Sequence, residues 1–428
     1  MALEARDVRS GMVAAGLIAA PLVILVALTV VTSPHDLAIL GADLDTYRGY
    51  ADRTLAGAVP YSDFSLEYPP LALVAMIVPA LIAAPAGGGF TAYAGAFALV
   101  AGALAAVAGW LLLRSAARPI EALATWVLLV AIAATSAAWR YDLWPSVLVL
   151  AALVATERRR SGLAGIALGA GAAMKLFPIA VVPVLALRAT ASGDRPGLRR
   201  LLGGTAAALT AVAVGSWVVA GGDALQPLAY QLDRGLQLES VGAGLLLLGH
   251  AAGALPADVI HRFGSLQVEA PGADVLASAS GLVQAALVTA ACGLAFVAFR
   301  RDTRTVGSVP LDRTAEATVA VIAALLVGSK VFSIQYVLWM LPLVPLLRPS
   351  QRVLGTLVAV CSTLVYPVGY AGLWQLDPAM IVLLDVRNLL LVAFLAMLLV
   401  DLARGPANAP AGGVSRREPR RSPGGAPA

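Results

Sequence analysis

Apolar stretches of about 20 residues recur along the whole chain, and they constrain its fold more than any other feature. A helix of that length crosses the ~30 Å hydrocarbon core of a bilayer. Clear stretches lie near 11–32, 91–113, 120–138, 201–220, 277–299, 353–372 and 379–400. Shorter ones, near 69–84, 143–156, 161–173, 177–187, 241–254, 314–329 and 335–347, indicate short or tilted crossings or re-entrant segments. We therefore expect an all-α polytopic membrane protein with about 12 transmembrane helices.

The composition supports this fold class. Of 428 residues, 59% are hydrophobic and 13% are charged, whereas a soluble domain is about 25% charged. Too few polar side chains are present to cover a soluble surface, which argues against soluble enzymes, disordered regulators and a nucleic-acid partner. Cys292 and Cys361 lie in apolar segments, so we expect buried thiols rather than a disulfide framework or a thiol metal site.

Arginine clusters predict which loops face the cytoplasm. They lie at 158–160, 188–200, 300–304, 348–352 and in the tail. The acidic segment 33–68 then faces outward, and the number of crossings is even because both ends of the chain lie inside. One short run between 69 and 156 is expected not to traverse the membrane, since the arginines at 158–160 would otherwise lie outside. We expect a cytoplasmic N-terminus (1–10), a retained first helix rather than a cleaved signal peptide, a membrane domain (11–402) and a disordered, basic cytoplasmic tail (403–428).

The two lysines among the 30 basic residues are the sharpest candidates for chemistry. Lys175 lies in the segment Met174-Lys-Leu-Phe-Pro178, and Lys330 lies in the similar segment Ser329-Lys-Val-Phe-Ser333. Each segment joins two short apolar runs on the predicted outer side. An ammonium group at such a break is suited to hold a phosphate as a point charge. The alternative is a lysine at a helix end that extends its charge to the membrane interface.

The acidic outer segment offers a general base. Asp43 and Asp45 follow the first apolar run by roughly ten residues, which is near the membrane surface. A carboxylate there is able to take the proton of a sugar hydroxyl that attacks an activated donor. The other Tyr, Asp and Glu side chains of the segment suit sugar hydroxyls. The alternative is a solvated acidic loop that only follows the topology.

Three further polar islands interrupt the apolar pattern: 140–142 (Arg-Tyr-Asp), 233–240 (Asp-Arg-Gly-Leu-Gln-Leu-Glu-Ser) and 385–388 (Asp-Val-Arg-Asn). Ion pairs that join helices are an alternative explanation for each of them. His250 and His261 have no ligand spacing with a cysteine or a second histidine, which argues against zinc. Phosphate-binding loops, dinucleotide fingerprints and nucleophile elbows are absent from the sequence. We expect no cofactor, although a divalent metal is not excluded.

Taken together, these motifs resemble the polytopic GT-C glycosyltransferases of glycosyltransferase family 87, typified by actinobacterial polyprenyl-phosphate-mannose-dependent α-mannosyltransferases. The resemblance covers roughly residues 35–400. It is carried by the order and spacing of Asp43-Leu-Asp-Thr-Tyr47, Pro60-Tyr-Ser-Asp-Phe64, Glu67-Tyr-Pro-Pro70, Arg140-Tyr-Asp-Leu-Trp-Pro145, Lys175-Leu-Phe-Pro178, Arg234-Gly-Leu-Gln-Leu-Glu-Ser240, Ser329-Lys-Val-Phe-Ser333 with Gln335-Tyr336, and Arg387-Asn388.

The resemblance implies a GT-C-type helical bundle that performs an inverting transfer. A sugar, mannose by family, moves from a polyprenyl-phosphate carrier to an acceptor hydroxyl on the outer face of the plasma membrane. The family pattern assigns the catalytic carboxylate to Asp43, with Asp45 in reserve. The leaving phosphate requires cations, for which the candidates are Lys175, Lys330, Arg234 and Arg140. Tyr47, Tyr61, Asp63, Glu67, Gln237 and Glu239 are candidates for sugar contacts or for ordering the loop.

The acceptor stays open between a lipid and a glycan. Family branches that mannosylate phosphoinositide lipids tend to have histidines in the region that matches Ser333 to Trp339, and this chain has none there. The expected partners are the lipid-linked donor, the acceptor and membrane lipids. Two other functions stay possible, a secondary transporter and a non-catalytic lipid-carrier-binding protein. The long acidic outer segment fits a transport site near the membrane midplane poorly.

Overall fold

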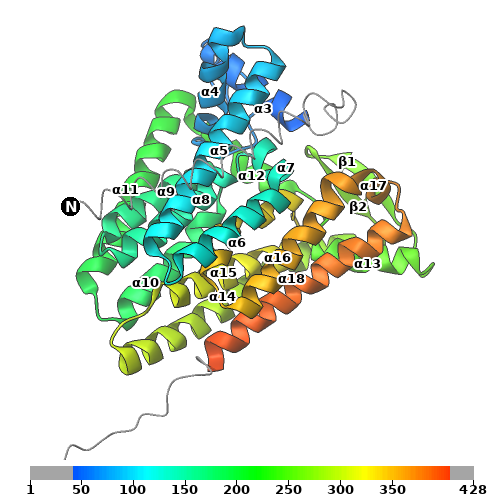
Figure 1. Cartoon of the computed structure of the whole chain (residues 1–428). Helices are drawn as coiled ribbons and strands as arrows, with labels where there is room; N and C mark the ends of the chain where they lie inside the picture. Colours follow the sequence, from blue (N-terminus) through cyan, green and yellow to red (C-terminus); the bar gives the residue numbers. More distant parts are fainter. Residues whose placement is uncertain (1–41, 405–428) are drawn as a thin grey trace, which may run out of the picture.

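A computed structural model describes residues 42–404 as a bundle of helices with one small β-hairpin (Figure 1). The predictions for residues 1–10, for the apolar run 11–32 and for the tail from residue 405 onward lie outside the described residues. Helix α18 (Pro378–Arg404) continues through residue 403, where the tail was expected to begin.

Five helical segments within residues 42–404 are long and apolar enough to cross a membrane. They contain α5 (Phe90–Ser115), α11 (Arg195–Ala220) with the 3-10 turn η3 (Gly221–Leu225), α14 (Ala273–Val306), α16 (Pro349–Thr363) with the turn η6 (Leu364–Val368), and α18. Their length and composition agree with the predicted fold class, a helical membrane protein.

Shorter elements fill the space between these helices. The apolar ones are α4 (Ala72–Ala83), α6 (Pro119–Ile132), α8 (Leu143–Glu157), α9 (Ser161–Met174), α10 (Val181–Ala191) and α13 (Val241–Ala251). The others are α3 (Ala42–Leu55), α7 (Ala134–Trp139), α12 (Gln226–Asp233), α15 (Leu311–Gly328) and α17 (Tyr370–Trp374). The predicted run 335–347 forms two 3-10 turns, η4 (Ile334–Trp339) and η5 (Val344–Leu346). Prolines in this run lack the N–H that a regular helix requires.

Helix α15 is the centre of the bundle. Nearly all of its residues are buried, and it contacts α8, α10, α14 and α18. Its apolar half consists mainly of Ala, Val, Ile and Leu, whose small or branched side chains allow several helices to approach one axis. This packing places the C-terminal end of α15, directly before Lys330, against the interior of α14, where Gln284 donates to the Leu325 carbonyl at 2.7 Å.

Helices α9 and α11 pack through glycines. A methyl group added at Gly165 would overlap the backbone carbonyl of Leu201, and one added at Gly204 would overlap the carbonyl of Gly162. Small residues at such a crossing let two backbones approach closely, which compensates for the weak driving force for helix association in lipid. The rest of α11 is largely exposed, including Trp217, whose exposure is 60%.

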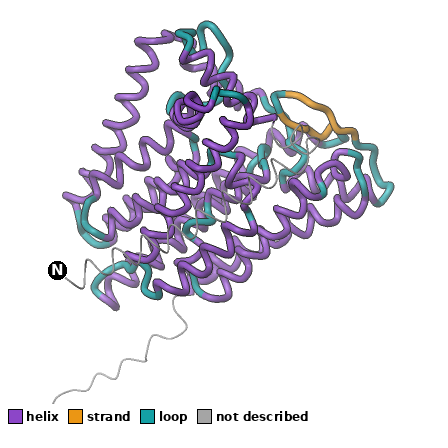
Figure 2. The backbone as a smooth tube through the Cα atoms, turned by 45° about the horizontal axis from the view of Figure 1, so that its top comes forward, coloured by secondary structure: helices purple, strands orange, loops and turns teal. Residues whose placement is uncertain are grey.

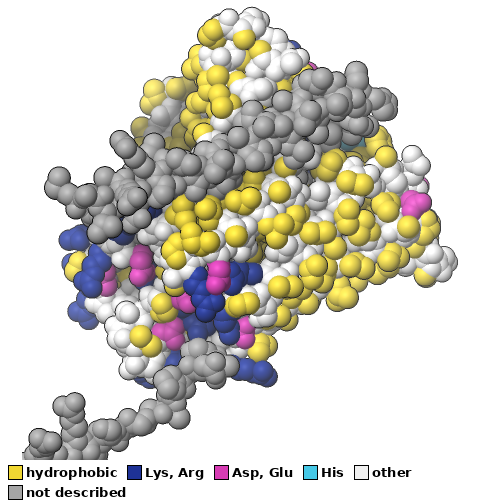
Figure 3. Space-filling model, in the orientation of Figure 1, with side chains coloured by type: hydrophobic (Ala, Val, Ile, Leu, Met, Phe, Trp, Pro, Cys, Tyr) yellow, Lys and Arg dark blue, Asp and Glu magenta, His cyan; other side chains and the backbone are white. Residues whose placement is uncertain are grey.

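Charged side chains gather at one end of the bundle, whereas hydrophobic side chains cover the middle of the face in Figure 3. We call this end the basic end and define it by the network of Asp302, Arg313, Glu316, Gln351 and Asp401. Arg313 of α15 donates to Asp302 of α14 at 3.0 Å and also pairs with Glu316. Gln351 of α16 donates to Glu316 at 2.6 Å and to Asp401 of α18 at 2.8 Å. This network therefore joins α14, α15, α16 and α18.

Two features differ from the expected helices-and-loops pattern. Strands β1 (Asp258–Arg262) and β2 (Ser265–Glu269) form an antiparallel hairpin, coloured orange in Figure 2. Backbone bonds join Leu238 to Leu266 and Leu236 to Val268, so the segment after α12 extends the sheet. The second feature is that part of the acidic segment forms a helix, α3, rather than a loop. Asp43 and Asp45 lie in its first turn, where carboxylates interact favourably with the helix dipole.

Candidate active site

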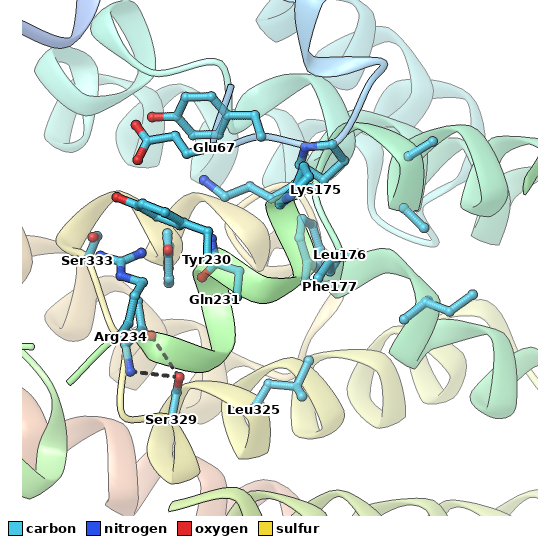
Figure 4. A pocket seen from close by; sticks show the side chains of 18 of the residues that line it. Glu67, Lys175, Leu176, Phe177, Tyr230, Gln231, Arg234, Leu325, Ser329 and Ser333 are labelled. Carbon is cyan, nitrogen blue, oxygen red and sulfur yellow. Dashed lines mark hydrogen bonds between the residues drawn. The ribbon is translucent and has the colours of Figure 1, made fainter. Parts of the chain in front are cut away.

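A cavity of about 790 Å³ lies among residues from α3, the segment after Tyr61, α9, α11, α12, the hairpin turn, α14, α15 and η4. Figure 4 shows Glu67 and Lys175 on one side of it and Arg234 with Ser329 on the other, with Tyr230 between them. The remaining wall is apolar and includes Leu176, Phe177, Ile179, Leu209, Val212, Leu325 and Leu326. The cavity therefore combines a polar region with a large hydrophobic surface.

Asp43 lines this cavity from the first turn of α3. Its carboxylate forms an ion pair with Arg140, which comes from the turn between α7 and α8. The Arg140 side chain is buried and also donates to the Tyr366 hydroxyl at 3.0 Å. Arg140, a sequence candidate for the phosphate, is not among the cavity-lining residues, and its contacts instead fix the orientation of the Asp43 carboxylate.

Asp45 has a different environment. Its side chain is 66% exposed and pairs with Arg48 at 3.3 Å on the surface of α3. It does not line the cavity. Since Asp43 and Asp45 lie two residues apart on a helix, their side chains point in directions about 200° apart, and only one of them is able to face the cavity.

Tyr47 forms the floor beneath Asp43. It lies one helical turn after Asp43, is 2% exposed and contacts the rings of Tyr68, Phe97 and Tyr141 at 5.7–5.9 Å between centroids. Burial, the main cause, raises the pKa of the Tyr47 hydroxyl well above its ordinary value. The hydroxyl therefore stays protonated and is able to donate a hydrogen bond at any physiological pH.

Lys175 lines the cavity directly after α9 and has a buried partner that was not assigned to the site from the sequence. Its ammonium lies 2.6 Å from Asp142, whose side chain is 1% exposed. It also lies 4.6 Å from the ring centroid of Tyr336 and 5.0 Å from that of Tyr141. The only sequence signal was the polar island at 140–142, which was compatible with an ion pair between helices. Asp142 therefore compensates the charge of Lys175 within the protein.

Arg234 lies across the cavity from Lys175 (Figure 4), and Lys330 also lines the cavity. The Arg234 guanidinium is buried, donates to Ser265 at 2.8 Å and lies 6.0 Å from the ring centroid of Tyr230. The Lys330 backbone carbonyl accepts a bond from the Gln237 amide at 2.9 Å, which ties the α15–η4 joint to the segment after α12. Burial lowers the pKa of the Lys330 ammonium. Arg234 and Lys330 therefore contribute two positive groups to the cavity lining, in addition to Lys175.

The remaining loop candidates divide into two groups. Glu67 lines the cavity. Tyr61 and Asp63 do not, and they stabilise the loop instead: the Tyr61 hydroxyl donates to the Tyr68 carbonyl at 2.8 Å, and the Asp63 carboxylate accepts from the Val59 amide at 2.7 Å. This arrangement fixes the segment that carries Glu67.

Gln237 and Glu239 lie behind the cavity wall. Gln237 donates to the hydroxyl of Ser333, a lining residue, at 2.7 Å. The Glu239 carbonyl accepts from Arg387 at 2.6 Å, and one oxygen of its buried carboxyl has no hydrogen-bond partner among the described residues. Burial, the largest cause, raises the pKa of Glu239 to about 7. Both residues therefore support the wall rather than form it.

Metal ligands are not gathered in this region. Within residues 42–404, no three His, Cys, Asp or Glu side chains lie close enough together to hold a metal ion. Cys292 and Cys361 are both free and half-buried.

The comparison with protein-family models matches residues 66–329 to glycosyltransferase family 87. No curated protein and no solved structure matches the chain. The matched segment includes Glu67, Arg140, Lys175, Arg234 and Glu239. Asp43 lies 23 residues before the matched segment and Lys330 directly after it, and the fold brings both into the same cavity.

Proposed function

Because the chain belongs to glycosyltransferase family 87, we propose that it transfers a sugar, mannose in the preferred case, from a polyprenyl phosphate to a lipid or glycan hydroxyl at the outer face of the plasma membrane. The observation that carries this proposal is the cavity itself. It holds one carboxylate fixed by a buried arginine, the cations Arg234 and Lys330 in addition to Lys175, and a wide apolar wall. These are the groups that transfer from a lipid-linked phosphate requires.

Asp43 is the general base in this proposal. The acceptor oxygen attacks the anomeric carbon of the donor while Asp43 takes the proton of the acceptor hydroxyl. The bond between that carbon and the phosphate oxygen breaks, and its electron pair leaves with the polyprenyl phosphate. Attack opposite the leaving group inverts the configuration. Arg140 holds the Asp43 carboxylate in place and so reduces the reorganisation that the step requires.

Arg234 and Lys330 stabilise the departing phosphate. Both line the cavity, whereas the charge of Lys175 is already paired with Asp142. Preorganised cations in a low-dielectric site stabilise developing negative charge strongly. The polyprenyl chain follows the apolar part of the lining, to which α11 contributes Leu209, Val212 and Ala213, and α14 contributes Ser280 and Gly281 beside it. No organic cofactor takes part.

The membrane arrangement follows from the same reasoning. The basic end faces the cytoplasm by the positive-inside rule, which orients the cavity outward. Helix α4 has 12 residues and spans only about 18 Å, so we assign it as the short run between 69 and 156 that does not cross. Helix α13 does not cross either in this proposal, because Arg234 before it and Phe263 after it line the same cavity. With the run at 11–32 as the first crossing, 12 of the 14 apolar runs then cross the membrane.

The experiment that tests the proposal is sugar transfer in proteoliposomes, with radiolabelled polyprenyl-phosphate mannose and a lipid extract from the source cells. Asp43→Asn should lower the transfer rate about 10²- to 10⁴-fold, the usual contribution of a general base. Asp45→Asn is the matched control, and it should stay within about twofold of the native rate because an exposed ion pair contributes little.

Equal loss in the two variants would contradict the role of Asp43. No product from the folded native chain, with several donor sugars tried, would contradict the glycosyltransferase proposal and favour transport of a substrate.

A further inference from the structure

The tip of the hairpin has an unusual residue for its backbone conformation. Arg262 pairs with Ser265, which leaves the two-residue turn Phe263-Gly264. Both turn residues have positive φ angles, 51° for Phe263 and 62° for Gly264. Two-residue hairpin turns of this type favour Asn, Asp or Gly at both positions, because a side chain with a large Cβ substituent is crowded in the left-handed region. Phenylalanine is therefore a costly choice for the turn itself.

The Phe263 ring has contacts on the cavity side that an asparagine would not make. It lines the cavity and meets the Tyr230 ring edge to face, with 5.6 Å between centroids. The Arg262 guanidinium also lies 5.7 Å from the Phe263 centroid. A strained conformation persists where the surrounding structure holds it, and such positions cluster at functional sites. The strain at Phe263 thus coincides with a ring that faces the site.

The rest of the turn also touches polar groups of the cavity. A Cβ atom at Gly264 would lie 3.5 Å from the Glu67 carboxylate and 3.5 Å from the Tyr230 hydroxyl. Ser265 accepts a bond from Arg234, a phosphate candidate, at 2.8 Å. The backbone bonds between β2 and the segment after α12 hold the turn at this position. The turn is therefore a fixed wall of the cavity beside Arg234.

We propose that Phe263 determines how the transferred sugar binds: its ring packs against the less polar face of the pyranose, while Glu67 and Tyr230 bond to the sugar hydroxyls. This inference rests on the proposed function and assigns a sugar subsite within it. The position beside Arg234 is consistent, since the sugar is bonded directly to the phosphate. The lipid chain, in contrast, lies against the apolar wall and does not contact the turn.

The experiment compares Phe263→Asn with Phe263→Tyr and with Arg159→Asn. Arg159 is the matched control because it has a positive φ of 57° in an exposed turn that does not line the cavity. Each substitution is made in the Asp43→Asn background, so that binding is measured without turnover. Radiolabelled polyprenyl-phosphate mannose and polyprenyl phosphate without sugar are the two ligands, and the melting temperature of each protein is recorded.

We expect Phe263→Asn to weaken binding of the sugar-bearing donor about tenfold, as loss of a buried aromatic contact does, without lowering the melting temperature. Polyprenyl phosphate alone should bind equally to all variants. Phe263→Tyr should retain donor binding, and Arg159→Asn should change neither ligand's affinity.

A lower melting temperature with unchanged donor affinity in Phe263→Asn would overturn the inference, because the ring would then serve only the fold. Equal weakening of both ligands would overturn it too, since the sugar would not be what Phe263 contacts. If the native cavity binds neither ligand, the proposed function itself fails, and this outcome is distinct from the other two.

Discussion

Replacing Lys175 by methionine should destabilise the protein, because it leaves the Asp142 carboxylate without its cation. The pair is 2.6 Å apart, and the side chains of Lys175 and Asp142 are 14% and 1% exposed. Removing one partner of a buried ion pair costs about 3–5 kcal/mol, since the remaining charge is neither solvated nor paired. The loss of the cation–π contact with Tyr336 at 4.6 Å adds roughly 0.5–1 kcal/mol. Trp339 still donates to Asp142 at 2.7 Å, but a single neutral donor does not replace an ammonium.

The assay is the free energy of unfolding in mixed micelles for four proteins: native, Lys175→Met, Asp142→Asn and the double variant. The double variant no longer buries an unpaired charge, so it should recover at least about 2 kcal/mol relative to Lys175→Met. The exposed pair Arg48–Asp45 provides the control, and Arg48→Met should cost less than about 1 kcal/mol.

A double variant as unstable as Lys175→Met would refute this reasoning, because the cost would then come from lost packing rather than from the unpaired charge. The donor KM of the double variant also separates structure from binding. If Lys175 contacts the donor phosphate as well as Asp142, the donor KM stays high after stability has returned.

Two further predictions concern the supports of the cavity. Burial raises the pKa of Glu239 from 4.5 to about 7, so the folded chain binds more protons here than the unfolded chain and loses about 3 kcal/mol of stability as pH rises from 4.5 to 7. Glu239→Gln should remove this pH dependence of the free energy of unfolding, while the neighbouring Arg387, Arg234 and Gln237 stay unchanged. Identical pH profiles of unfolding for the native protein and the variant would contradict this prediction. Gly165→Val should cost on the order of 3 kcal/mol or more in the same measurement, because its side chain overlaps the backbone of α11. Gly203→Val, which meets no atom within 4 Å, is the control that should show only the small helix-propensity effect.

Much of the site could be predicted from the sequence, because the cost of burying polar groups makes them conspicuous in apolar surroundings. Lys175 and Lys330 stood out in this way. Asp43 and Glu67 came instead from the acidic outer segment and Arg234 from a polar island, and all five line one cavity. Their meeting in one cavity could be expected without detailed knowledge of helix packing. Breaks between apolar runs on the same side of a membrane lie at the same depth, so the residues at these breaks are near one another.

Pairings across the chain could not be predicted in the same way. Asp142 and Lys175 are 33 residues apart, and Arg140 and Tyr366 are 226 apart. The pairing of these side chains depends on how α8, α9 and η6 pack against one another. No local sequence pattern encodes this packing. Thus the sequence singled out Arg140 and Lys175 as candidates for the site but did not identify their partners. The hairpin was missed for a related reason: its two five-residue strands carry too few alternating positions to stand out between long apolar runs.

The polar network of the basic end has a consequence for how the chain enters the membrane during synthesis. Helix α15 carries Asp312, Arg313 and Glu316 in its first two turns, yet its residues are almost entirely enclosed by other helices. Charged residues make insertion of an isolated segment unfavourable. The partner of Arg313 on α14 is synthesised earlier, but the residues of α16 and α18 that complete the network are synthesised later. We therefore expect α15 to acquire its final position only after α18 has left the ribosome, which makes insertion of α15, α16 and α18 a concerted step.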